Sequence, residues 1–284
     1  MYFLEDKKNK ILFATTAKAG CQHVRVLYRY FVLNKNDSKN IFNTNIKSIK
    51  LPENYKEYLI IIFFRNPYER LVSAFKEKYI KKNANRFKFK DIHYLDLKFV
   101  DFVNDLEINK LKNIDVSHFN IQIKNNNKLI DDKLLDHNNI KFFDIKNIDY
   151  IFLENIYKKK IPDEVKNFKG NHTYELKLKN SNTNKLFNDY VYDKPAKKYI
   201  DYKLLDCYFY NKELKKKVHD FYKKDFQFAK HFGYNYEIKN YNSCIKNNIN
   251  EPFSNKYQSD EIRYGRYGLI GLIFICLIIM FYLK

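Results

Sequence analysis

The sequence predicts an α/β fold in which helices flank a central parallel sheet, followed by a C-terminal transmembrane helix. Two short apolar runs, at residues 11–15 and 59–64, are each followed by a loop and an amphipathic helical pattern. Two successive strand-loop-helix units favour parallel strands with helices packed on them. The third observation is an uncharged apolar segment at residues 267–283, which has the length of a short membrane span.

The composition of the 284-residue chain is strongly basic, with a formal net charge of +20 at pH 7. The lysines are spread over the whole length, so we interpret most of them as a solvated surface that still favours anionic partners. The sequence contains no clustered basic stripe, and a nucleic-acid partner is not expected. The four cysteines form no C-x-x-C pair, so neither a disulfide framework nor a zinc site is predicted.

The first predicted unit is a strand over residues 11–15, the loop "TTAKAGCQ", and a helix with apolar spacing from Val24 to Phe31. A loop that opens a helix exposes backbone N–H groups, and the helix dipole favours an anion there. Lys18 adds a mobile positive charge. The triphosphate-binding loop is excluded, because its lysine follows its second glycine, whereas Lys18 precedes Gly20. Taken alone, such a loop is more often an ordinary tight turn.

The second predicted unit reads "LIIIFFRNPYERLVSAFKEKY", in which an apolar strand over residues 59–64 ends in Arg65. Pro67 suits the first turn of the following helix. Parallel strands end at one edge of a sheet, where open α/β sheets bind ligands. We therefore expect Arg65 to lie near the loop lysine of the first unit, with Ser73 on the same side two helical turns later. A guanidinium and a hydroxyl would then converge on one phosphate while the lysine loop holds another.

Later elements are predicted from weaker patterns. Residues 148–156, "IDYIFLENI", are predicted to form a strand that ends in an acid, and residues 167–198 a long irregular loop. Helical spacing from Leu214 to Phe226 predicts a helix that stops at Gly233.

Several of these stretches resemble a known family. "FFRNPYERLVSAFKEKY" resembles the 3′-phosphate-binding signature of sulfotransferases that use 3′-phosphoadenosine 5′-phosphosulfate (PAPS), and "AKAGCQHVRVL" resembles their 5′-phosphosulfate loop. The group that the chain resembles is the membrane-bound carbohydrate sulfotransferases of the chondroitin and HNK-1 type. "VSHFNIQ", "IDYIFLENI" and "VHDFYKKDFQFAKHFGY" resemble later elements of that group in the same order, so the similarity runs from about residue 10 to residue 236.

The resemblance implies a P-loop-like nucleotide-binding fold that transfers a sulfuryl group from PAPS to a carbohydrate hydroxyl without a metal. It implies that Lys18 contacts the 5′-phosphosulfate and the bridging oxygen of the leaving group, while Arg65 and Ser73 hold the 3′-phosphate. Backbone N–H groups would surround the phosphosulfate; these belong to Ala19, Gly20, Cys21 and Gln22. As in phosphoryl transfer, positioning and charge stabilisation then do most of the catalytic work.

A general base is expected to take the proton of the acceptor hydroxyl. His118, in "VSHFNIQ", is the first candidate, and His23 and Glu154 are reserves. The spacing of Arg70 places its side chain away from the phosphate clamp, so we interpret it as structural.

Two departures from the family pattern leave alternatives open. Ala17 stands where the family usually has proline, and Gln22 where it usually has a hydroxyl residue, which removes one phosphate contact. One alternative is therefore a membrane-tethered binding protein of the same fold without turnover. A basic nucleic-acid-binding module is a second, and a nucleoside-triphosphate enzyme a third, although the sequence shows neither the phosphate loop nor the magnesium-binding acids of that class.

The predicted boundaries are a sulfotransferase domain over residues 1–239, a polar linker over 240–266 and a transmembrane anchor over 267–283. A buried core helix is the alternative for the last segment, but such a helix would be apolar on every face. Arg263 and Arg266 precede the anchor, and this favours the cytoplasm for the domain, whereas the family resemblance implies the Golgi lumen. The expected partners are a carbohydrate acceptor and a membrane, and the oligomeric state stays open.

Overall fold

The computed structural model describes most of the chain up to residue 238. The described ranges are 1–34, 45–80, 92–93, 96–109, 116–125, 128–168, 189–199 and 204–238. The chain divides into the units Met1–Tyr241 and Asn242–Lys284. None of the helices in the described ranges is long and apolar enough to cross a membrane. The predicted linker and the predicted anchor both lie outside these ranges.

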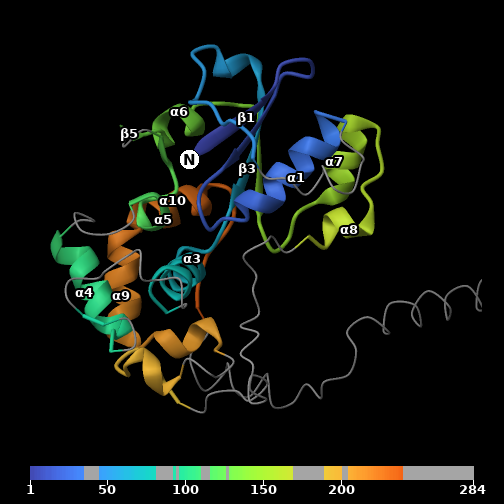
Figure 1. Cartoon of the computed structure of the whole chain (residues 1–284). Coiled ribbons are helices and arrows are strands. Elements are labelled where there is room, and N and C mark those ends of the chain that lie inside the picture. The colour runs from blue at the N-terminus through green and yellow to red at the C-terminus, as the bar shows by residue number, and fades with distance from the viewer. Residues whose placement is uncertain are drawn as a thin grey trace, which may run out of the picture. The chain divides into compact units, whose positions relative to one another are not determined.

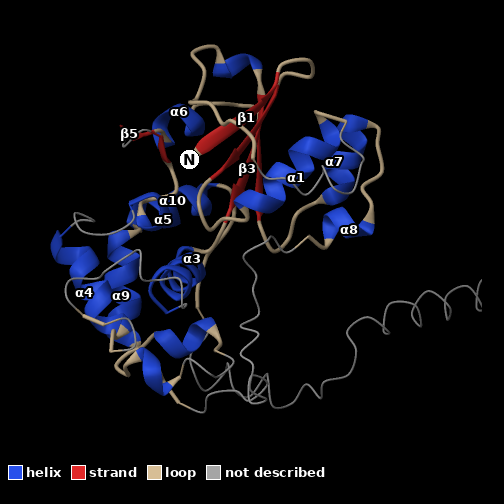
Figure 2. Cartoon of the chain, in the orientation of Figure 1, coloured by secondary structure: helices blue, strands red, loops and turns tan. Residues whose placement is uncertain are grey.

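A four-stranded sheet forms the centre of the first unit (Figures 1 and 2). Its strands, in spatial order, are β1 (Tyr2–Asp6), β2 (Ile11–Thr15), β3 (Leu59–Phe64) and β6 (Ile140–Asp144). The last three strands are parallel, and β1 pairs antiparallel with β2. The predicted α/β class with a central parallel sheet flanked by helices is thus confirmed, and both predicted strands have the bounds that the sequence indicates.

Strand β3 is apolar at every position because it contributes to both faces of the sheet. Ile61 and Phe63 join one buried cluster, together with Leu27 of α1. Ile62 and Phe64 join a second cluster on the other face. In Figure 1 the helices α1, α7 and α8 cover the first face, whereas α6 and α10 lie on the opposite side.

The described residues also form several α-helices. They are α1 (Cys21–Phe31), α3 (Pro67–Phe75), α4 (Phe99–Asn109), α5 (Val116–Phe119), α6 (Asp131–Leu135), α7 (Tyr150–Tyr157), α8 (Asp163–Lys166), α9 (Lys212–Phe221) and α10 (Lys223–His231). Shorter elements are the 3₁₀ turns η1 (Tyr55–Glu57), η4 (Ala196–Lys198) and η5 (Asp206–Phe209), the π-helical turn η2 (Lys76–Ile80), and a small hairpin of β4 (Lys124–Asn125) and β5 (Lys128–Leu129).

Helix α3 begins as the sequence indicates. The side chain of Asn66 accepts a hydrogen bond from the Tyr68 N–H at 3.1 Å, and Pro67 occupies the first helical position. Near the end of the domain, the single predicted helix is divided into α9 and α10 at Tyr222, whose backbone leaves helical geometry. The expected stop at Gly233 is present, because this residue has a left-handed φ of 84°.

The strand predicted over residues 148–156 is wrong, because most of this segment forms helix α7. Asp149 caps the helix by accepting a hydrogen bond from the Phe152 N–H at 2.9 Å. The apolar residues of the run serve only one face: Leu153 is buried, whereas Ile151 is 67% exposed. The third parallel strand lies earlier, at β6. A short apolar run does not by itself separate a strand from a helix.

The cysteines also differ from expectation. Cys207, in η5, is disulfide-bonded, whereas Cys21 is free. The remaining two cysteines of the sequence, Cys244 and Cys276, lie outside the described ranges. Spacing along the chain did not indicate a disulfide, because the cysteines are widely scattered.

Glu154 secures the end of α7 with an almost buried carboxylate, 5% exposed. It accepts a hydrogen bond from the Ile161 N–H at 2.9 Å and forms ion pairs with Lys166 at 3.0 Å and Lys160 at 3.2 Å. The bond from Ile161, followed by the two lysines, lowers the pKa of Glu154 to about 2. This carboxylate therefore stabilises the fold only in its ionised form.

The Glu154→Gln variant should accordingly be less stable than the wild type at pH 7. A depressed pKa contributes stability above the unfolded pKa of about 4.3, and this contribution disappears as the pH falls through the folded pKa. The stability difference between variant and wild type should thus shrink between pH 4 and pH 2. Urea unfolding at several pH values measures it, with the exposed Glu164→Gln as control. A difference that stays constant over this range would contradict the assignment.

Candidate functional site

The loops that follow β2 and β3 meet at the carboxyl edge of the sheet. Arg65, the first residue after β3, donates a hydrogen bond from Nη1 to the carbonyl oxygen of Lys18 at 3.3 Å. Two segments far apart in the sequence therefore lie together at this edge, as the parallel strands predict.

The loop after β2 has the shape of an anion-binding turn. Lys18 and Gly20 both have a left-handed φ of 67°, and the Ala19 N–H donates to the Thr16 carbonyl at 3.1 Å. Gly20 is the residue before α1, and no side chain caps the first turn of that helix. Gly20 has no side chain that could cap this helix start, and a helix start of this kind favours an anion.

Gly20 also has a packing reason to be glycine. A Cβ atom added there would lie 2.2 Å from Cδ1 of Ile145, which follows β6. The side chain of Ile145 therefore leaves no room for a side chain at position 20. The left-handed conformation of Gly20 is a second reason against a larger residue.

The buried side chain of Arg70 holds the same loop by hydrogen bonds. Its side chain is 1% exposed, and it donates from Nε to the Ala17 carbonyl at 2.9 Å and from Nη1 to the Asn120 carbonyl at 2.8 Å. These bonds tie the residue before Lys18 to the segment that follows α5. The contacts agree with the interpretation of Arg70 as structural. They also show that Arg70 supports the backbone of the loop that carries Lys18.

Gln122 holds the backbone of Arg65 on both sides. Its Oε1 accepts from the Arg65 N–H at 3.3 Å, and its Nε2 donates to the Arg65 carbonyl at 2.9 Å. The backbone N–H of Gln122 in turn donates to the fully buried Asp225, at 2.8 and 2.9 Å to the two carboxylate oxygens. Burial raises the pKa of Asp225 to about 6, and the charge of Arg70 opposes the shift. Sequence reasoning noted the segment of Gln122 without finding this role.

The guanidinium of Arg65 keeps donor capacity that the fold does not use. An arginine carries five N–H donors, and within the described residues its buried Nε has no hydrogen-bond acceptor. The nearest counter-charge is Glu69, whose Oε2 lies 3.9 Å from that nitrogen. Glu69 also pairs with Lys146 at 2.6 Å.

Lys18 faces a carboxylate that the sequence analysis did not single out. Its ammonium is ion-paired with Oε2 of Glu77 on η2, and the two side chains are 14% and 19% exposed. The other carboxylate oxygen of Glu77 lies 3.6 Å from Nζ of Lys78. Both residues belong to "KEKY", the end of the quoted signature, so their place in that block was the signal available in the sequence.

Ser73 and His118 are less closely joined to this cluster. Ser73 is half-buried in α3, and no hydrogen bond links it to Arg65 in the part of the chain that the structure describes. His118 is half-buried on α5, with Nδ1 2.9 Å from the hydroxyl oxygen of Ser117. Their predicted roles stay predictions.

The two reserve bases are engaged elsewhere. His23 is buried, with Nδ1 2.9 Å from the Phe168 carbonyl and Nε2 3.1 Å from the Tyr150 hydroxyl. Burial lowers the pKa of His23. Both nitrogens thus have structural partners, and Glu154 is committed to the end of α7 as described above.

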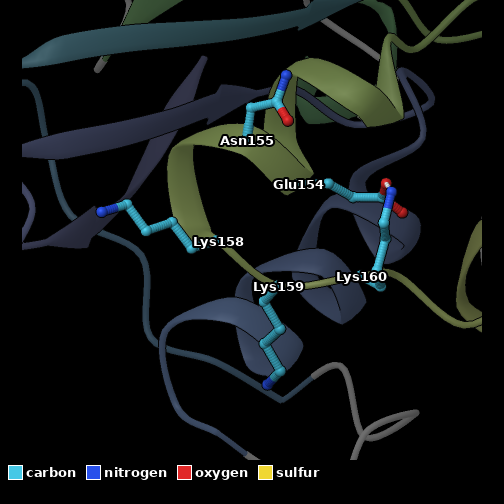
Figure 3. Close-up of a pocket in the computed structure, with 5 residues that line it drawn as sticks. All are labelled: Glu154, Asn155, Lys158, Lys159 and Lys160. Atoms are coloured by element: carbon cyan, nitrogen blue, oxygen red, sulfur yellow. Dashed lines mark hydrogen bonds and ion pairs between the residues drawn. The ribbon is translucent and has the colours of Figure 1, made fainter.

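A separate shallow pocket of about 250 Å³ lies at the end of α7 (Figure 3). Its lining residues are Glu154, Asn155, Lys158, Lys159 and Lys160. Lys159 donates to the Tyr30 carbonyl at 2.8 Å, and Lys160 pairs with Glu154. The pocket contains neither Lys18 nor Arg65, so it is not the predicted phosphate site.

No group of three or more His, Cys, Asp or Glu residues within the described ranges could hold a metal ion.

A family model, described as the sulfotransferase family, matches residues 1–235. No curated protein and no solved structure gives a significant match. The matched span covers the sheet, both loops and α10.

Replacement of Arg70 by methionine should destabilise the protein by about 3–5 kcal/mol, the usual cost of removing one member of a buried charged network. The change leaves the carbonyls of Ala17 and Asn120 without their donor and Asp225 without its nearby cation. Denaturant unfolding measures the loss. Arg29→Met is the matched control, because Arg29 donates to the Asn45 carbonyl in an exposed contact and should cost less than about 1 kcal/mol. Equal losses in both variants would argue against the proposed bracing.

Proposed function

Because the chain belongs to the sulfotransferase family, whose chemistry is the transfer of a sulfuryl group, we propose that it transfers this group from PAPS to a hydroxyl of a carbohydrate. The observation that carries the proposal is the contact between Arg65 and the Lys18 loop. It joins, at one sheet edge, the two segments that resemble the 3′-phosphate and 5′-phosphosulfate sites.

The chemistry of these residues fits the donor. The phosphosulfate would lie against Lys18 and the uncapped start of α1, where N–H groups and the helix dipole favour an anion. The 3′-phosphate would take the remaining donors of Arg65, with Ser73 as a further ligand. During in-line transfer, Lys18 would stabilise the charge that develops on the bridging oxygen.

The two departures from the family pattern are compatible with activity. Ala17 lacks the stiffness of proline, but Arg70 holds its carbonyl by a buried hydrogen bond. Gln22 lacks the hydroxyl, but it lies in the first turn of α1, where the helix dipole favours an anion. This favours turnover over the alternative of an inactive binding protein.

The acceptor is proposed to be a carbohydrate because the signature resembles the carbohydrate sulfotransferases. The formal net charge of +20 favours an acidic glycan, since a positive field draws polyanions to the protein.

Residues 267–283 are proposed to anchor the protein in a membrane by a single span. We place the catalytic domain on the luminal side, because Cys207 is disulfide-bonded and disulfides persist in oxidising compartments. This choice follows the family resemblance rather than the flanking charges.

The donor site is tested with Lys18→Ala and Arg65→Ala in the full chain. Loss of charge-assisted hydrogen bonds worth about 1.5–3 kcal/mol should weaken adenosine 3′,5′-bisphosphate binding by Arg65→Ala about 10- to 100-fold. Lys18→Ala should lower the transfer rate by about 10²–10³-fold, as for removal of an oxyanion donor. Calorimetry measures binding, and transfer of labelled sulfate to a glycan panel measures turnover.

Lys10→Ala is the control for these variants, because Lys10 pairs with Glu57 at the surface. Equal bisphosphate binding by Arg65→Ala and the wild type would refute the assignment. Tight binding without transfer to any acceptor would instead favour the inactive binding protein.

The luminal address is tested by protease treatment of intact membrane vesicles that contain the full chain. A luminal domain should resist digestion until detergent is added, and Cys207 should react with maleimide only after reduction and unfolding. Digestion of the domain in sealed vesicles would place it in the cytoplasm instead.

A further inference from the structure

We propose that Glu77 is the general base of this site: its carboxylate takes the proton of the acceptor hydroxyl while Lys18 supports the leaving group. The inference rests on the proposed function and assigns a residue that the family signature does not identify as catalytic.

The starting observation is an acid inside an anion-binding site. Glu77 contacts the ammonium of Lys18 and lies 3.6 Å from that of Lys78. Beside a donor that carries several negative charges, a carboxylate repels the ligand, so its presence opposes donor binding. The two side chains are only 14% and 19% exposed, and an ion pair this enclosed adds little net stability, because the cost of removing both charges from water offsets much of their attraction. A role in the reaction accounts for it better.

The backbone around Glu77 is unusual in the same place. Helix α3 continues into the π-helical turn η2 (Lys76–Ile80), and π turns are rare and concentrate at functional sites. Tyr79, 1% exposed, holds this turn in the core. Its ring lies 6.0 Å from that of Phe75 and 5.2 Å from that of Phe102, between centroids. These ring contacts hold the turn in place, with the carboxylate of Glu77 against the ammonium of Lys18.

The other candidate bases have partners of their own. His23 uses both ring nitrogens in structural contacts, and Glu154 is bound to Ile161 and two lysines. His118 lies on α5, with Nδ1 2.9 Å from the hydroxyl oxygen of Ser117. Glu77, in turn, contacts the ammonium of Lys18 directly.

The proposed step balances as follows. When the donor binds, the ammonium of Lys18 exchanges its ion pair with Glu77 for a contact with the bridging oxygen of the donor. The acceptor oxygen bonds to sulfur while the bond from sulfur to the bridging oxygen breaks, and adenosine 3′,5′-bisphosphate leaves with the electron pair. The hydroxyl proton passes to a carboxylate oxygen of Glu77 and later to solvent. General bases of this kind contribute about 10²–10⁴-fold to rate.

The test compares Glu77→Gln with the wild type in two independent measurements. Turnover of labelled PAPS is followed with the best acceptor of the glycan panel and with water as the acceptor. Binding of adenosine 3′,5′-bisphosphate is followed by calorimetry. We expect kcat to fall by about 10²–10⁴-fold, while the bisphosphate binds as tightly as to the wild type or more tightly, because a repelling charge is removed. A merely structural defect would weaken binding as well.

Three further variants sharpen the result. Glu57→Gln removes a carboxylate from an exposed lysine pair and should keep wild-type turnover. His118→Asn should retain at least a tenth of it. Formate should restore part of the activity of Glu77→Ala, because a small carboxylate can occupy the vacated space and accept the proton.

The inference is overturned if Glu77→Gln keeps its kcat, if it loses bisphosphate affinity in step with turnover, or if His118→Asn shows the larger loss of kcat. Each of these outcomes is judged against a wild type that binds the bisphosphate and turns over PAPS. A wild type that neither binds the bisphosphate nor turns over PAPS refutes the proposed function itself.

Discussion

The buried guanidinium of Arg70 is the interaction on which the site depends. It lies under the sheet edge and donates to the carbonyls of Ala17 and Asn120, so one side chain sets the distance between the Lys18 loop and the segment after α5. That segment carries Gln122, whose amide brackets the backbone of Arg65. The two loops that would hold the donor are therefore positioned by the buried guanidinium of Arg70 and the side-chain amide of Gln122.

Burial divides the charged residues of this region into two kinds. Arg70 and Asp225 are enclosed, and backbone groups satisfy much of their hydrogen-bonding capacity. Lys18 and Arg65 reach the surface and retain contacts that an incoming anion can replace. Charges of the first kind are expensive to remove once the fold has formed around them, whereas charges of the second kind exchange partners readily. The site thus combines a rigid frame with adjustable ligands.

The sequence predicted those parts of the fold that local patterns determine. Strands β2 and β3 and the start of α3 follow from apolar runs, small-residue loops and a proline at a fixed place. The segment at 148–156 was misread because a short apolar run has no period of its own, and only the cap at Asp149 and the exposed Ile151 show it to be helical. The ion pair between Lys18 and Glu77 joins residues from the two different strand-loop-helix segments, so no spacing rule could reveal it.

The π-helical turn η2 also has an evolutionary side. A π turn is an α-helix that accommodates one additional residue, so a single inserted codon is enough to produce it. Such an insertion rotates everything after it by about 100° relative to the residues before it, which keep their places. In this protein the residues before the turn include Ser73, and those within it include Glu77. The carboxylate at the lysine could therefore have entered an existing helix without disturbing the part of α3 that is proposed to bind the 3′-phosphate.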